Sequence, residues 1–329
     1  MNLPRMNVIG INIGGTKCAV SRLVDGRQVE ETHRFPTQGR DDTLDALRRA
    51  VASLRPHSAP VFGISCGGPL DAARGLILSP PNLPGWENTD ITRFFTTHFG
   101  GTAVLMNDAN ACALAEWRFG AGRGTRHMIF LTAGTGLGTG LILNGDLYEG
   151  ATGDAGEAGH LRLSSGGPVG FGKAGSFEGF CSGGGIARLA EIILRESSSR
   201  PEWANVQPLS ARVVAEAAAA GDSLALAVMT ESGRRLGEGL AILIDLLNPE
   251  RIVIGGIFPR CQDLLRPAME AALQREALTI PLGACQVVPA ELGETIGSHG
   301  AICAALRAID SGKVKPLKLV GLPPAPLRS

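Results

Sequence analysis

The stretch that decides the fold is VIGINIGGTKCAVSRL, residues 8–23. An apolar run, Val8–Ile13, leads into the glycine turn Gly14-Gly15-Thr16, and a second run, Cys18–Leu23, follows it. Short apolar runs on both sides of a glycine turn predict two strands joined by a hairpin. Such a turn can hold a phosphate with its backbone N–H groups, because glycine lets the backbone approach closely.

The same arrangement returns further along the chain as MIFLTAGTGLGTGLIL, residues 128–143. It predicts a strand at Met128–Thr132, a glycine turn at Gly134–Thr139 and a returning strand at Gly140–Leu143. Two such units predict duplicated α/β domains that face each other across a cleft. The expected domains are residues 1–117 together with a C-terminal helix at about 298–312, and residues 118–297.

The rest of the chain has the alternation of an α/β protein. Further strands are expected at residues 29–35, 61–65, 103–106, 251–254 and 286–288, and helices at 41–54, 109–119, 182–196, 223–247 and 301–309. The tail after Lys313 is rich in Pro and Lys and is expected to be mobile.

Composition excludes several classes of protein. The 329 residues are too many for one ordinary domain, and the 44% of apolar residues suffices for real cores. Thirty-one basic and 31 acidic residues balance, which predicts no general attraction to nucleic acid or to a membrane surface. Residues 1–6 do not resemble an export signal, and the seven scattered cysteines fit reduced thiols. We expect a soluble, cytoplasmic protein.

Two better-known phosphate motifs nearly match and are discarded. GPVGFGKA, residues 167–174, is one residue short of a P-loop, and Ala174 lacks the hydroxyl that would bind magnesium. Gly134-Thr135-Gly136 would open a helix in a dinucleotide-binding fold, but Leu141–Leu143 continues as a strand. A glycine hairpin that grips phosphate is the better interpretation.

Taken together, these motifs resemble the ROK family of sugar kinases and sugar-responsive repressors, over roughly Val8 to Arg307. The resemblance implies two duplicated actin-like (ribonuclease H-like) domains around a central cleft, with ATP and Mg²⁺ as cofactors. The implied nucleotide-binding residues lie in the two hairpins and in the motif Ile252–Gly256: Asn12, Gly14, Gly15, Thr16, Lys17, Thr132, Gly134, Thr135, Gly136, Gly255 and Gly256.

The resemblance makes Asp108, in Asn107-Asp108-Ala109-Asn110, the catalytic residue. Phosphoryl transfer to a sugar needs a carboxylate that accepts the hydroxyl proton. The alternative is that Asp108 only caps the helix that follows it.

The implied sugar-binding residues are Gly68, Asn82, Asn107, Asp108, Glu157, His160 and Glu178. Polyol recognition needs several paired donors and acceptors, and a carboxylate accepts from two hydroxyls at once. The alternative interpretation, that Glu157 and Glu178 are only surface charges, is weak because glycines flank both.

The chain departs from the family at two places. Val169, Phe171 and Ser176 stand where the family has zinc-binding cysteines, so no zinc is expected and His160 remains as a sugar contact only. Asn12 replaces the aspartate that orients the water shell of magnesium, and it brings an amide oxygen without charge.

The resulting expectation is an ATP-dependent kinase of a hexose or N-acetylhexosamine. One alternative is a catalytically weak sugar-binding or sensor protein of the same family, suggested by Asn12. Another is a relative that acts on a different acceptor, such as a carboxylate or polyphosphate. The first hairpin starts too early to leave room for a DNA-binding helix-turn-helix, so the expected partners are a sugar and ATP, without nucleic acid or membrane, and a homodimer is possible.

Overall fold

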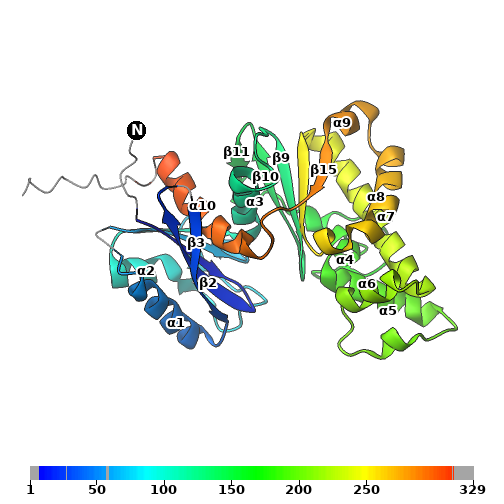
Figure 1. Cartoon of the computed structure of the whole chain (residues 1–329), viewed down its shortest axis with the longest axis horizontal. Coiled ribbons are helices and arrows are strands. Elements are labelled where there is room, and N and C mark those ends of the chain that lie inside the picture. The colour runs from blue at the N-terminus through cyan, green and yellow to red at the C-terminus, as the bar shows by residue number, and fades with distance from the viewer. Residues whose placement is uncertain (1–6, 27, 57–58, 313, 315–329) are drawn as a thin grey trace, which may run out of the picture. The chain divides into compact units, whose positions relative to one another are not determined.

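The structure, a computed structural model, describes residues 7–26, 28–56, 59–312 and 314. The tail after Lys313, expected to be mobile, lies outside the described residues apart from Val314. The chain divides into two compact units: unit 1 is Met1–Ala111 with Gly297–Ser329, and unit 2 is Cys112–Ile296. Each unit is built on a mixed sheet with helices against it, which confirms the predicted α/β class (Figure 1).

The two main sheets have equivalent strand orders, so the predicted duplication is confirmed. In each, an antiparallel hairpin leads and two parallel strands follow. Unit 1 has the order β3 (Gln28–Pro36), β2 (Lys17–Val24), β1 (Val8–Ile13), β4 (Val61–Cys66), β8 (Thr102–Asn107). Unit 2 has the order β11 (Asp146–Tyr148), β10 (Leu137–Leu143), β9 (Met128–Ala133), β14 (Arg251–Gly256), β15 (Gln286–Pro289).

The sheet of unit 1 buries both of its faces. Alternate residues of β1, among them Ile9 and Ile11, pack in one core with α1 (Arg40–Ser53) and α2 (Ile91–Phe99). The opposite face receives α10 (Ile296–Asp310), which meets the register partners Gly10 and Gly63. A Cβ on Gly63 would lie 1.9 Å from the carbonyl oxygen of Ala301, so α10 can approach this closely only because the position is glycine.

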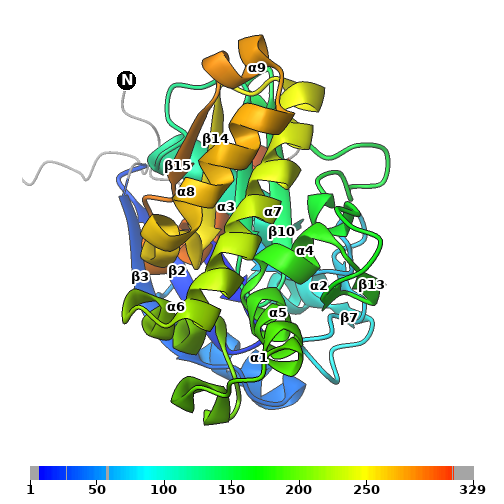
Figure 2. The same cartoon turned by 90° about the vertical axis from the view of Figure 1, so that its right-hand side faces the viewer.

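Unit 2 packs its helices around one large core, with α7 and α8 running across a face of the sheet (Figure 2). Its helices are α4 (Phe177–Cys181), α5 (Gly183–Glu196), α6 (Ala211–Ala219), α7 (Ser223–Leu247), α8 (Phe258–Glu276) and α9 (Thr279–Ala284). The side chain of Asp222 caps the start of α7, and Asn248, in the left-handed conformation, ends it.

The smaller elements complete the two units. Helix α3 (Asp108–Phe119) runs from unit 1 into unit 2. Three short strands, β5 (Leu70–Asp71), β6 (Leu76–Ile77) and β7 (Thr89–Asp90), form a small sheet, and β12 (Val169–Gly170) pairs with β13 (Lys173–Ala174). Single turns of 3₁₀ helix occur at Ala158–His160, Glu202–Asn205 and Gly293–Thr295.

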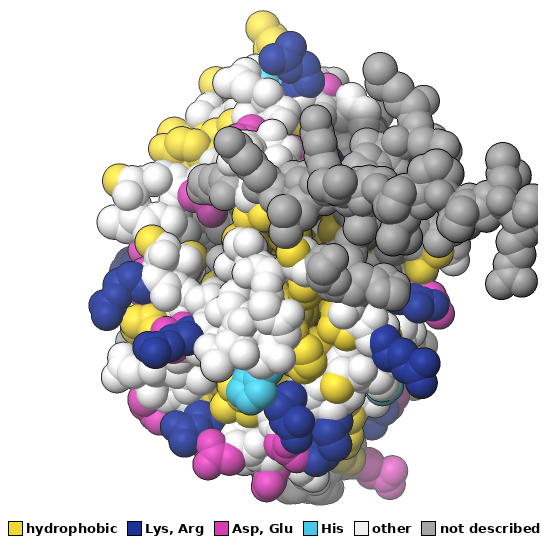
Figure 3. All heavy atoms as spheres, turned by 90° about the vertical axis from the view of Figure 1, so that its left-hand side faces the viewer, with side chains coloured by type: hydrophobic (Ala, Val, Ile, Leu, Met, Phe, Trp, Pro, Cys, Tyr) yellow, Lys and Arg dark blue, Asp and Glu magenta, His cyan; other side chains and the backbone are white. Residues whose placement is uncertain are grey.

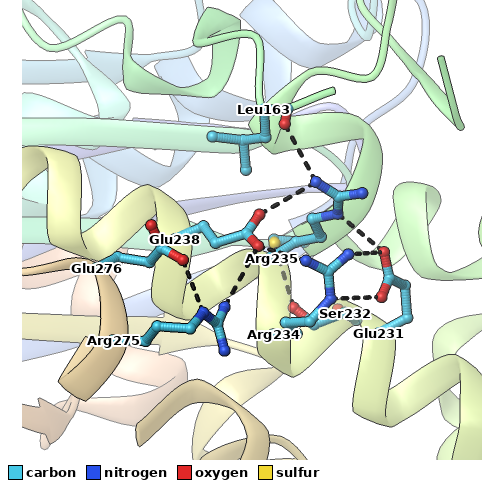
Figure 4. A network of polar contacts seen from close by, with 9 residues as sticks. Leu163, Glu231, Ser232, Arg234, Arg235, Glu238, Arg275 and Glu276 are labelled. Carbon is cyan, nitrogen blue, oxygen red and sulfur yellow. Dashed lines mark hydrogen bonds and ion pairs between the residues drawn. The ribbon is translucent and has the colours of Figure 1, made fainter. Parts of the chain in front are cut away.

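Charged side chains of α7 and α8 form a network of hydrogen bonds and ion pairs (Figure 4). Arg235 donates to Glu231 at 2.8 Å, to Glu238 at 3.1 Å and to the carbonyl of Leu163 at 3.1 Å. Its guanidinium also lies 4.6 Å from the ring centre of Phe180 on α4. Burial works to raise the pKa of Glu231, but hydrogen bonds and charge from Arg234 and Arg235 prevail and lower it. Arg235 thus bonds with two carboxylates of its own helix and with the backbone of the segment before α4.

A fully buried carboxylate, Glu116, ties α3 to two other segments of unit 2. It accepts hydrogen bonds from the N–H groups of Ala121, Glu291 and Leu292 at 2.8–3.2 Å. These donors meet the needs of a charge that would otherwise be costly to bury.

Among the described helices, no single one is long and apolar enough to cross a membrane; α6 and α7 pass that test only as a pair, and they are bent by 117° at their junction. On the face of the molecule drawn in Figure 3, basic and acidic side chains are interspersed.

Candidate functional site

The first glycine hairpin, in unit 1, is held by its carbonyl groups. The carbonyl of Gly14 accepts the hydroxyl of Thr37 at 2.6 Å, and the carbonyl of Thr16 accepts the N–H of Thr37 at 3.0 Å. Because the N–H of a trans peptide points opposite to its C=O, the N–H of Gly15 is turned away from Thr37. The hairpin is thus fixed from one side and presents backbone donors on the other, which suits an anion.

The loop that carries Asn82 packs against this hairpin. A Cβ on Gly15 would lie 2.7 Å from both the Cβ and the carbonyl oxygen of Asn82, so glycine is required there. Leu83 and Trp86 are buried in the core of unit 1 and anchor the loop, while Asn82 stays exposed. The two motifs, distant in sequence, therefore form one surface within unit 1.

Asp108 is the first residue of α3, at the end of β8, and Asn107 caps the helix beside it. The side-chain oxygen of Asn107 accepts the N–H groups of Ala109 at 2.9 Å and Asn110 at 3.3 Å. Oδ1 of Asp108 accepts from the N–H of Ala109 at 2.8 Å. Because Asn107 supplies the cap, α3 does not depend on Asp108 for one.

The second carboxylate oxygen of Asp108 lies next to the Gly67-Gly68 turn. A Cβ on Gly67 would be 3.6 Å from Oδ2 of Asp108, and one on Gly68 would be 3.5 Å from Nδ2 of Asn107. The parallel pairing of β4 with β8 places Cys66 opposite Asn107, so both turns leave the same edge of the sheet. Three of the predicted sugar-site and catalytic positions, Gly68, Asn107 and Asp108, are therefore neighbours in unit 1.

The surroundings of Asp108 affect its ionisation. Asp108 has solvent-accessible surface, but many protein atoms surround its carboxyl group. The resulting loss of solvation disfavours the charged form and raises the pKa of the Asp108 carboxyl above its ordinary value. The N–H groups of Ala109 and of Asp108 itself oppose the rise. A carboxylate with a raised pKa accepts a proton more readily than an ordinary aspartate does.

Asn12 lies on β1 and faces the start of α10. A Cβ on Gly297 would lie 2.7–3.0 Å from the atoms of the Asn12 amide, so the amide packs directly on the first turn of α10. Asn12 therefore reaches the positive end of a helix, where a negative charge would be stabilised.

The second glycine hairpin, in unit 2, is fixed in the same manner as the first. The carbonyls of Gly134 and Thr135 accept the N–H groups of Gly183 and Gly184, at 2.7 and 3.3 Å, in the first turn of α5. The N–H groups of Thr135 and Gly136 consequently point away from α5. A different segment thus performs in unit 2 the task that Thr37 performs in unit 1.

Glu178, near the start of α4, is bound to this hairpin. Its Oε2 accepts the N–H of Leu137 at 3.0 Å and would lie 2.7 Å from a Cβ on Gly136. A Cβ on Gly159 would lie 2.5 Å from the carbonyl oxygen of Leu137, so the turn that bears Glu157 and His160 also packs on the hairpin strand. The predicted sugar-binding residues of unit 2 and its glycine hairpin form one packed cluster.

Gly255 and Gly256 end β14 beside the second hairpin. The parallel pairing with β9 sets Gly255 opposite Thr132 and Gly256 opposite Ala133. Gly256 has φ of 71°, and a Cβ there would lie 2.1 Å from the carbonyl oxygen of Ala133. Only glycine satisfies both conditions.

The loop that carries Val169, Phe171 and Ser176 is held by ordinary packing. The ring of Phe171 meets the ring of His160 edge-on at 5.2 Å, and the Lys173 ammonium donates to the carbonyl of His160 at 2.6 Å. Ser176 caps α4 through the N–H of Gly179 at 3.1 Å, and β12 pairs with β13. Nε2 of His160 lies 3.9 Å from a carboxylate oxygen of Glu157. Residues 167–174 thus contain a small hairpin and not a P-loop.

We predict that the purified chain holds far less than one zinc ion per molecule. A zinc site here would need thiolates at positions 169, 171 and 176. Val169, Phe171 and Ser176 stand there and take part in the packing of this loop. Metal analysis of tag-free protein measures the zinc content directly, and the melting temperature should not change when a chelator is added. Stoichiometric zinc would contradict the prediction.

Sequence reasoning missed the residues that hold the hairpins. These residues are Thr37, Gly183, Gly184 and Glu178, the last through its bond to Leu137. Each joins segments that are far apart in the chain, and no local pattern marks it. The one available signal was the glycine run Gly183–Gly185 at a predicted helix start, which indicates a close backbone approach.

Comparison with known proteins agrees with this arrangement. The chain is 30% identical over 311 residues to a glucokinase of Thermotoga maritima, covering 91% of this chain and 97% of that protein. A ROK hexokinase structure from Thermus thermophilus is similar with a TM-score of 0.77 and 30% identity, covering 93% of this chain and 99% of the other. A ROK family glucokinase from Streptomyces griseus, solved with glucose and AMPPNP, gives 0.74 and 31%, covering 92% and 99%. The model of the ROK family matches residues 8–308, and the chain belongs to the ROK family.

Proposed function

We propose that the chain is an ATP-dependent sugar kinase that phosphorylates a hydroxyl of a hexose or N-acetylhexosamine. The observation that supports this most is the pair of glycine hairpins, each tied back through its carbonyls so that backbone N–H groups face outward. The names of the similar proteins, two glucokinases and a hexokinase, support the same reaction.

In the proposed reaction, Asp108 takes the proton of the sugar hydroxyl as its oxygen attacks the γ-phosphorus of ATP. The bond from the γ-phosphorus to the bridging oxygen breaks, and ADP leaves with that electron pair. The hairpin N–H groups bind phosphate oxygens, while Asn82, Glu157, His160 and Glu178 bind and orient the ring hydroxyls.

The residues of this chain suit a magnesium ion that the nucleotide phosphates carry. Magnesium keeps several waters and takes few protein ligands, and Asn12 offers one neutral amide oxygen beside the first hairpin. When bound, the ion neutralises charge on the phosphate oxygens. Within the described part of the chain no three His, Cys, Asp or Glu side chains group as a metal site.

The second candidate is a sugar-binding sensor with little turnover, and Asn12 is the observation that favours it. An ADP-release assay over a panel of hexoses and N-acetylhexosamines separates the two functions. A kinase releases ADP with at least one sugar well above the sugar-free rate. A sensor binds a sugar in calorimetry but releases no ADP above the sugar-free rate.

Gly136→Ala is expected to raise KM for the sugar several-fold, although residue 136 belongs to the phosphate hairpin. The new methyl group would push Oε2 of Glu178 away from its place 2.7 Å from that Cβ. Gly134→Ala is the matched variant, since the nearest atom to its Cβ is 3.9 Å away and Glu178 is not displaced. It should affect KM for ATP more than KM for the sugar. Equal effects of both substitutions on the sugar KM would refute the role given to Glu178.

A further inference from the structure

Arg188 on α5 is an arginine whose bonding is incomplete. Its Nε is buried and has no hydrogen-bond partner. Among the described residues, Arg188 has no hydrogen bond or ion pair with another group. Arg235, also partly buried in unit 2, bonds with two carboxylates and a carbonyl. Buried donors in native proteins are normally satisfied, so the unsatisfied Nε of Arg188 needs an explanation, and an acceptor bound beside the guanidinium would supply one.

The guanidinium reaches back toward the second glycine hairpin. Long side chains on a helix lean toward its N-terminus, over the residue four positions earlier, which here is Gly184. The point that a Cβ of Gly184 would occupy lies 3.3 and 3.4 Å from Nη1 and Nη2 of Arg188. The same point lies 2.9 Å from the carbonyl oxygen of Thr135, at the tip of the hairpin. The absence of a side chain at residue 184 therefore leaves the space through which Arg188 approaches the hairpin.

The electrostatics of this position are unfavourable without a ligand. The first turn of α5 carries the positive end of the helix dipole, and a cation close to it is repelled. A bound phosphate would be attracted both by the dipole of α5 and by the guanidinium of Arg188, because arginine binds phosphate oxygens through paired N–H donors.

We propose that Arg188 binds a phosphate group of the nucleotide held by the second hairpin. The inference rests on the proposed function and adds to it a binding residue that none of the sequence motifs contains. It predicts that Arg188 contributes to the affinity for ADP and not to the affinity for adenosine, which has no phosphate.

The test is the calorimetric Kd of ADP and of adenosine, measured without sugar for the wild type and for Arg188→Met. Methionine keeps much of the length and removes the charge. The Kd for ADP should rise about ten- to hundredfold, as expected for one charge-assisted hydrogen bond, and that for adenosine should stay the same. Because the unpaired Nε is gone, the unliganded melting temperature should be unchanged or higher.

Two further variants serve as controls. Arg195→Met removes an exposed charge from the last turn of the same helix and should leave both Kd values unchanged. Arg188→Lys keeps the charge but not the paired donors, and its Kd for ADP should be intermediate. The proposal is wrong if Arg188→Met binds ADP within about twofold of wild type, or if it loses ADP and adenosine equally with a lower melting temperature.

These outcomes are separable from a failure of the proposed function. If the wild-type chain binds ADP but phosphorylates no sugar, the kinase reaction is refuted. The role of Arg188 is then still decided by comparing the Kd values of the wild type and Arg188→Met. A wild-type chain that does not bind ADP refutes both.

Discussion

Asp108→Asn is expected to lower kcat by about 10²–10⁴-fold and to leave the Kd of ADP nearly unchanged. The amide keeps the shape of the carboxylate but cannot take the hydroxyl proton, which is the contribution of a general base. Asn107 continues to cap α3, so the substitution should not disturb the helix. Steady-state kinetics on an accepted sugar and calorimetry with ADP measure the two quantities.

Asp90→Asn is the matched control for this substitution. Asp90 also stands between a short strand and a helix, where it accepts the N–H of Arg93 at 2.9 Å as the cap of α2. Asparagine caps helices about as well as aspartate, so both stability and kcat should be preserved. Asp108→Asn that retains more than about half of the wild-type kcat would sink the assignment of the base.

The pH profile gives an independent check on Asp108. The carboxylate form is the active one, so kcat/KM falls as the pH drops through the pKa of the folded enzyme. Because burial raises that pKa, the acid limb should lie above the value of about 3.9 for a free aspartate. An acid limb at or below the free value would mean that another group titrates.

Asn12→Asp is expected to raise kcat by roughly 10–10²-fold and to lower the Mg²⁺ concentration for half-maximal rate. Restoring the carboxylate adds a charge-assisted hydrogen bond to the water shell of the ion, worth about 1.5–3 kcal/mol. The new charge would face the first turn of α10, whose dipole favours it by about 0.3–1 kcal/mol. The variant should therefore fold as well as the wild type.

Magnesium titrations of both forms on the same sugar decide this point. The wild type should be active but need an unusually high Mg²⁺ concentration, since Asp108 and both hairpins remain. Unchanged kcat and unchanged Mg²⁺ dependence in Asn12→Asp would mean that another group already binds the water shell of the magnesium ion.

The elements that the sequence predicted best are those with a strong local pattern. Helix α7 was expected at 223–247 and forms there, because apolar spacing and the capping Asp222 agree. Both hairpins were expected, since β1 with β2 and β9 with β10 combine apolar runs with glycine turns that few other structures tolerate.

Some of the elements that were missed contain residues that locally favour a break. Helix α8 contains Pro259 in its first turn and Pro267 in its interior, and so was not expected. Helix α10, expected at 301–309 and as a C-terminal helix at about 298–312, begins at Ile296, where Gly297 and Gly300 pack against Asn12 and Ala111. Tertiary packing decided these cases against local propensity.

The candidate site also has a part that the sequence predicts and a part that depends on tertiary structure. Residue types at motif positions could be assigned from the sequence, whereas the bonds that orient them could not. Nothing near Thr37 marks it as the residue that fixes the first hairpin, and Glu178 was expected to bind sugar without any sign of its bond to Leu137. Such contacts join segments whose proximity depends on the whole fold.

The central claim, that Asp108 drives transfer of a phosphoryl group from ATP to a sugar hydroxyl, is tested most directly by detecting the product. Phosphorus NMR of wild type and Asp108→Asn, each incubated with ATP, Mg²⁺ and the best sugar of the panel, follows ADP and sugar phosphate together. We predict a sugar-phosphate resonance that grows in step with ADP for the wild type and is at least about a hundredfold slower for Asp108→Asn. ADP formation without sugar phosphate, or equal sugar phosphate from both proteins, would contradict the account.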